Sequence, residues 1–109
     1  MFGCHSQANR TAFLEEYLTV ADEIVRMVDS NPTTEGVKQA QTYLDSKKVS
    51  LKTKFEAGKK ESPDKEMMEK FSVIITGQVA KVSKLPEKHP VLKNELENLA
   101  RDFGEFLLK

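Results

Sequence analysis

Apolar side chains recur at helical spacing in the last stretch of the chain, residues 91–109. Successive members lie four, three, four and three positions apart: Leu92, Leu96, Leu99, Phe103 and Phe106. This spacing puts them on one face of a helix. The opposite face holds the charged residues Lys93, Glu97, Arg101, Asp102 and Glu105. A helix divided in this way needs partners for its apolar face, so we expect the rest of the chain to cover it.

Three earlier segments show the same helical period. Proline suits the first turn of a helix and is excluded from its interior, so Pro32, Pro63 and Pro90 divide the chain into four helical segments. The first segment begins near Asn9 or Thr11, and Asn31 and Ser62 are the expected caps of the second and third. The expected core positions before residue 86 are Phe13, Tyr17, Val20, Ala21, Ile24, Met27, Val28, Val37, Ala40, Leu44, Leu51, Phe55, Met67, Phe71, Ile74, Ile75, Val79, Val82 and Leu85.

The connections between these segments are short, which makes consecutive helices antiparallel neighbours. The sequence therefore predicts an all-α fold, an up-down-up-down antiparallel four-helix bundle. Its length of 109 residues suits one small domain. Residues 1–10 show no periodicity and are expected to form a flexible lead-in or tether, with the bundle over residues 11–109.

The overall charge excludes some classes of function. Seventeen basic and seventeen acidic side chains cancel, which argues against general nucleic-acid binding. No run of about 20 apolar residues is present to span a membrane. Cys4 is the only cysteine, so an intrachain disulfide and a multi-cysteine zinc site are excluded.

Charge is distributed unevenly over the first two segments. Residues 13–32 are mainly acidic, whereas residues 33–61 carry seven lysines against four acids. The two segments are therefore expected to attract each other if they lie antiparallel. The lysines are typical of a solvated face, or alternatively form a docking surface for an acidic partner or an anionic membrane. The candidate partner-binding residues are Lys47, Lys48, Lys52, Lys54, Lys59 and Lys60.

Signals of catalysis, metal binding and cofactor binding are weak. The chain has no glycine-rich phosphate loop, no His-Glu-x-x-His pair and no EF-hand loop. Cys4 and His5 are adjacent but lie on the expected tether, where nothing would hold a reactive geometry, and His89 lies in a loop with only scattered acids nearby. We therefore expect no enzyme activity, no metal and no cofactor. Gly77 and Gly104 interrupt helical segments, which indicates close helix packing, simple tolerance of glycine or a small pocket beside them.

The stretch Phe2-Gly3-Cys4 resembles the end of a bacterial lipoprotein signal, in which a small residue precedes the lipidated cysteine. This resemblance implies a lipid anchor on Cys4, a location in the bacterial periplasm and membrane contact only through that anchor. Under this interpretation Met1 replaces a removed signal sequence. A native start at Met1 in the cytoplasm is the alternative.

Over residues 13–109 the helix lengths and breaks are similar to those of the periplasmic b-type cytochrome four-helix bundle. Ser62-Pro63-Asp64, followed by Met68 and Phe71, resembles that family's entry into its third helix. The family binds haem through a methionine early in the first helix and a histidine late in the last. At the corresponding places this sequence has Tyr17 and Leu18, and Phe103 and Phe106. The resemblance therefore implies the fold and not haem binding.

These observations favour a non-enzymatic helical bundle at the cell envelope that binds a protein partner. The alternative is a cytoplasmic carrier of a small ligand or cofactor, with a pocket between helices. The protein is expected to be a monomer or a homodimer. The wide apolar stripe of the first segment, with Leu14, Leu18 and Val25, is one surface through which two copies would pair.

Overall fold

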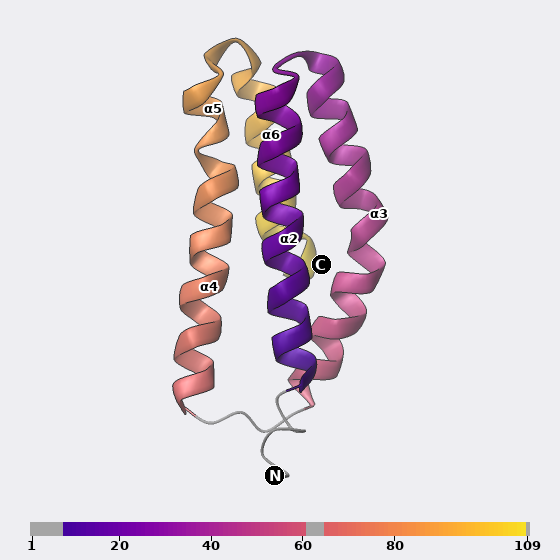
Figure 1. Ribbon diagram of the computed structural model, residues 1–109, viewed down its shortest axis with the longest axis vertical. Helices are drawn as coiled ribbons and strands as arrows, with labels where there is room; N and C mark the ends of the chain where they lie inside the picture. The colour runs from indigo at the N-terminus through magenta and orange to yellow at the C-terminus, as the bar shows by residue number, and fades with distance from the viewer. Residues whose placement is uncertain (1–7, 61–64, 109) are drawn as a thin grey trace.

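The computed structural model describes residues 8–60 and 65–108 and is all-α over those ranges (Figure 1). No strand occurs in the described ranges, and their extents are 50 × 23 × 23 Å. Four long helices dominate, joined in part by a short helix and a 3₁₀ turn, and a second 3₁₀ turn follows the last helix. The elements are α2 (Ala8–Ser30), α3 (Thr34–Lys59), α4 (Lys65–Ser83), α5 (Leu85–Lys88), η1 (Pro90–Leu92), α6 (Lys93–Glu105) and η2 (Phe106–Leu108).

Helices α2 and α6 face each other across the core, flanked by α3 and α4. Helix α2 packs against α3 and α4, and α6 packs against α3, α4 and α5. Figure 1 shows α6 behind α2 in this view, between α3 and α4. In this arrangement the neighbouring helices cover the apolar face of α6.

The predicted burial of the last apolar series is confirmed. Each of its members, from Leu92 to Phe106, is buried in the main core cluster, together with most of the expected positions of α2 and α3. Full burial of one such side chain stabilises the fold by about 1.5–3 kcal/mol. The packing of α6 therefore follows directly from the spacing of its apolar residues.

An aromatic cluster joins α2 to the other helices. The rings of Tyr17 and Phe103 stack with their centroids 4.4 Å apart, and the Tyr17 hydroxyl donates a hydrogen bond of 2.9 Å to the backbone oxygen of Phe103. Phe13 extends the cluster, with ring-centroid distances of 5.3 Å to Tyr17 and 5.8 Å to Phe71 on α4. Burial of the Tyr17 hydroxyl raises its pKa strongly, so this group stays protonated and remains a donor.

Helix α4 is less buried than the sequence predicts. Phe71, Ile74, Ile75 and Val79 were all expected in the core and are only half-buried, although they pack against it. For Phe71, Ile74 and Ile75 the reason is the length of α6, whose 13 residues and following turn cover only part of α4 (Figure 1). A polar residue, Gln78, takes a buried position instead, and its Oε1 has no hydrogen-bond partner in the described structure.

The predicted start of α2, near Asn9, was close, whereas the predicted start of α3 was wrong by two residues. Helix α2 begins at Ala8, so the last three residues of the expected lead-in are helical. The Arg10 guanidinium lies 5.3 Å from the centroid of the Phe71 ring, a cation–π contact that favours helix in this turn. The cap of α3 is Thr33 rather than Asn31, because the Thr33 hydroxyl accepts a hydrogen bond of 3.1 Å from the Gly36 N–H. The expected cap Ser62 lies outside the described residues.

The tight connection from α2 to α3 requires glycine at position 36. A Cβ on Gly36 would overlap the carbonyl oxygen of Asn31. By contrast, a Cβ on Gly77 in α4 would meet no atom within 4 Å. The two glycines therefore have opposite structural roles, although both lie in helices.

We expect the Gly36→Ala substitution to lower the free energy of unfolding by about 1–3 kcal/mol, the usual range for overpacking. The higher helix propensity of alanine alone would raise the free energy of unfolding by about 1 kcal/mol. A decrease would therefore come from the clash with Asn31. Gly77→Ala is the matched control and should raise the free energy of unfolding by about 1 kcal/mol. Urea denaturation followed by circular dichroism measures both changes. Stabilisation by Gly36→Ala would contradict the close approach of the two backbones.

Candidate functional site

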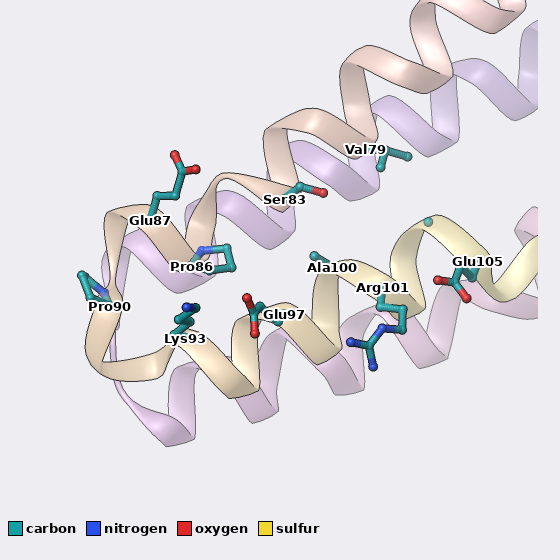
Figure 2. Close-up of a pocket in the computed structure, with 11 residues that line it drawn as sticks. Val79, Ser83, Pro86, Glu87, Pro90, Lys93, Glu97, Ala100, Arg101 and Glu105 are labelled. Carbon is teal, nitrogen blue, oxygen red and sulfur yellow. The ribbon is translucent and has the colours of Figure 1, made fainter.

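An open groove lies between α4 and α6 and is closed at one end by α5 and η1 (Figure 2). Its volume is about 840 Å³. The groove arises because α5 carries the chain across from α4 to α6 through a segment with Pro86 and Pro90, neither of which can continue a long helix. The groove is lined by Val79, Ser83, Pro86, Glu87, Pro90, Lys93, Glu97, Ala100, Arg101, Gly104 and Glu105.

Small and apolar groups form the floor of the groove, and charged groups form its rim. Pro86 and Ala100 are buried, and Val79 and Gly104 are half-buried. A Cβ on Gly104 would lie 3.5 Å from Val79 Cγ1, so α4 and α6 approach each other closely at that point. The remaining lining residues are exposed, and five of them are charged. The groove therefore opens to solvent along its length.

The rim on α6 is a row of charges with alternating sign. Lys93, Glu97, Arg101 and Glu105 follow one another at intervals of four residues, which places them along one side of the helix. In the part of the chain that the structure describes, none of the four forms an ion pair, and Arg101 donates one long hydrogen bond of 3.4 Å to Asn98 Oδ1. Figure 2 shows Lys93, Glu97 and Ala100 on the groove side of α6.

The candidate lysines of α3 are divided among several neighbours. Lys48 lies beside α6, where its Nζ is 2.6 Å from Asp102 Oδ2 and 3.0 Å from Asp45 Oδ1. Burial alone would lower the pKa of Lys48, but the hydrogen bonds to Asp102 and Asp45 outweigh it and raise the pKa. Lys48 is thus a charged link between α3 and α6.

Lys54 faces a different helix. Its Nζ lies 2.9 Å from Glu16 Oε1 on α2, and the Ser50 hydroxyl donates a second hydrogen bond of 2.9 Å to the same oxygen. Burial alone would raise the pKa of Glu16, but the hydrogen bonds from Lys54 and Ser50 outweigh it, so the pKa is lowered. The predicted attraction between the acidic first segment and the basic second one is confirmed at this pair.

The other four candidate lysines lie along α3 and at its end, and Lys47 lines the same depression beside Glu16 as Lys54 does. Lys47 Nζ is 5.7 Å from the centroid of the Tyr43 ring, and Lys59 Nζ is 3.3 Å from Glu56 Oε1. Lys52 is half-buried, and Lys60 is the exposed C-cap of α3. The six lysines therefore do not all share one face, because Lys48 faces α6 whereas Lys47 and Lys54 lie beside Glu16 of α2.

His89 contacts an acid on α2. Its Nε2 lies 2.8 Å from Asp29 Oδ1, and Lys88 Nζ lies 2.8 Å from Asp29 Oδ2. These contacts fasten α5 to the end of α2. Over residues 8–60 and 65–108, no three histidine, cysteine, aspartate or glutamate side chains are grouped as metal ligands would be. Cys4 and His5 lie outside the described residues.

Of the two glycines that indicated a pocket, Gly104 lines the groove and Gly77 does not. Sequence reasoning missed the groove itself and the buried Gln78. The sequence does hold a signal for the buried Gln78, because this glutamine stands within an apolar series, between Ile75 and Val82.

Comparison with known proteins gives no relationship for this chain: no family model, curated protein or solved structure matches it. None of the described helices has both the length and the apolar composition needed to cross a membrane.

The Asp29 contacts predict a dependence of stability on pH. The hydrogen bond with His89, followed by that from Lys88, holds the pKa of Asp29 below its usual value. A carboxylate with a lowered pKa stabilises the fold above its unfolded pKa of about 3.9, and this contribution is lost as pH falls through the lower folded value. We therefore expect Asp29→Asn to reduce the free energy of unfolding by up to about 1 kcal/mol at neutral pH.

The difference in free energy of unfolding between the wild type and Asp29→Asn should disappear as pH falls below the lowered pKa of Asp29. Urea denaturation at a series of pH values measures it. Glu69→Gln, at an exposed carboxylate on α4, controls for the loss of one negative charge. A difference that stays constant with pH would contradict the proposed role of the Asp29 carboxylate.

Proposed function

We propose that this protein is a non-enzymatic helical bundle that binds a protein partner, and that the partner inserts a helix into the groove between α4 and α6. The observation that carries this proposal is the form of the groove: a floor of small and apolar groups between exposed charges. A helix that lies along such a groove sets small or apolar groups against the floor and keeps its charges at the rim, and a helix in a groove is a common mode of peptide recognition.

We assign the partner to the groove rather than to the lysines of α3. Lys48 and Lys54 already form ion pairs with Asp102 and Glu16, so a partner would have to compete with acids of the protein itself. The charged row on α6 has no such internal competitors among the described residues. Gly104, which the sequence indicated as a pocket residue, lies in the floor of the groove.

We further propose the up-down-up-down topology for the four long helices. The connection between α2 and α3 is only three residues long, and α5 and η1 join α4 to α6 within nine residues. Short connections of this kind favour antiparallel neighbours. In this topology the groove lies between two neighbouring helices that are joined at its closed end.

The second candidate is a cytoplasmic carrier of a small ligand or cofactor. A volume of about 840 Å³ is within the range of about 300–1,000 Å³ for small-molecule sites. Such sites bury most of the ligand and are mainly apolar, whereas this groove is open and has five charged lining residues. The lining therefore favours a protein helix.

Site-specific photo-crosslinking tests the groove as the binding surface. We expect a benzophenone amino acid at Ser83, on the α4 side of the groove, to form adducts with a discrete protein in the cells that naturally produce this chain. The same group at Lys38, exposed on α3 and outside the groove, is the control and should form no such adduct. Mass spectrometry identifies the adduct. Equal adducts from both positions, or none from Ser83, would overturn the proposal.

We also propose that a lipid on Cys4 anchors the protein at the periplasmic side of a bacterial membrane, on the basis of Phe2-Gly3-Cys4. When the protein is produced with its natural upstream coding region, mass spectrometry should find diacylglycerol on Cys4, and Cys4→Ser should release the protein from the membrane fraction. An unmodified Cys4 in the wild type would remove the envelope location and leave the cytoplasmic alternative.

A further inference from the structure

The row of charges on α6 is complementary to itself when it is reversed. Lys93, Glu97, Arg101 and Glu105 carry the signs plus, minus, plus and minus at equal intervals. An antiparallel copy of the row, centred at Leu99, sets Lys93 against Glu105 and Glu97 against Arg101. Every position in the row then meets the opposite charge. A parallel copy in register sets each residue against its own kind, and four like-charge contacts result.

We propose that the helix at the groove is α6 of a second copy of this chain, which presents its exposed, charged side, so that the protein forms a two-fold symmetric dimer. This inference rests on the proposed function and names its partner. A two-fold interface uses the same patch on both copies, so a patch that is complementary to itself in the antiparallel sense is what such an interface requires.

The state of the four side chains in the single copy supports this pairing. Neighbours in the row are spaced so that they could pair along the helix, yet no ion pair joins them among the residues that the structure describes. All four are exposed. Their charges are therefore directed to solvent in the single copy and are available to a second one.

The floor of the groove supplies the apolar part of the interface. Ala100 and Gly104 lie one helical turn apart beside the charged row, and neither carries a side chain that would hold a second helix away. Val79 and Pro86 add apolar surface from α4 and α5. Pro86 and Ala100 are already buried in the single copy, so the floor mainly permits a close approach, whereas the exposed ion pairs set the orientation.

The expected dimer is weak, because only one short helix from each copy enters the interface. Helix α6 has 13 residues, a length of about 20 Å. Sedimentation velocity of the full chain, from about 10 µM to about 1 mM, should show a monomer that becomes a dimer as the concentration rises. Association should weaken as salt is added, because salt screens the exposed charges.

Charge reversal tests both the partner and the orientation. Glu97→Arg places arginine against Arg101 of the second copy at two symmetric positions, and Arg101→Glu places glutamate against Glu97. Each variant alone should dimerise at least about tenfold more weakly than the wild type. An equimolar mixture of the two variants should recover the dimer, because each reversed charge then meets its complement. Glu69→Arg, at an exposed position on α4 outside the groove, is the matched control and should dimerise like the wild type.

The outcomes separate this inference from the proposed function. The second copy is not the partner if the wild type stays monomeric at the highest concentration. The same holds if the mixture of the two variants dimerises no more strongly than either variant alone. If the Ser83 crosslinks then identify a different protein, the groove remains the binding surface. If Ser83 forms no adduct and the wild type is monomeric, both proposals are wrong. Circular dichroism of each variant confirms that the helices are intact.

Discussion

The contact between Tyr17 and Phe103 fixes how the first helix meets the last. The two rings stack in a fully buried position, and the Tyr17 hydroxyl donates to the backbone oxygen of Phe103. A buried hydroxyl without a hydrogen-bond partner costs about 1–3 kcal/mol. This hydrogen bond therefore favours one position of α6 along the axis of α2. Because Phe103 belongs to the apolar series of α6, the contact also fixes which side of α6 remains outside.

The proposed binding surface is a consequence of that packing. Once the apolar side of α6 is buried, the charged row from Lys93 to Glu105 must lie outside, beside α4. Pro86 and Pro90 carry the chain between the two helices without a long helix of their own, which leaves a depression between them. The packing of the core and the groove thus have the same origin, because the short helix α6 has one apolar side and one charged side.

Periodicity was sufficient to predict the all-α fold and the core face of α6, because burial of apolar side chains dominates the energetics. It was insufficient for α4. The half-burial of Phe71 and Ile75 depends on where the shorter α6 ends, which no pattern within α4 contains. The start of α3 also differed, because Thr33 and Asn31 are both good caps and the backbone contact at Gly36 decides between them.

The candidate site could be predicted only in part. The α3 lysines looked like one cluster in the sequence, but a helix turns by about 100° per residue. Lys48 and Lys54 therefore face α6 and α2 respectively, and each meets an acid there. Gly104 was correctly singled out as a possible pocket residue, whereas the groove beside it depends on how α5 separates α4 from α6.

Native-state hydrogen exchange tests most directly whether α6 is held against α2 as described. Core elements exchange their amide protons only through large openings, whereas frayed ends exchange with almost no free-energy cost. We expect the amides of Leu99 and Phe103 to exchange with a free energy within about 1 kcal/mol of global unfolding. The Tyr17→Phe substitution should lower the protection of both amides. Exchange of these two amides as fast as in an unfolded chain would contradict the central claim that buried contacts with α2 hold the last helix in place.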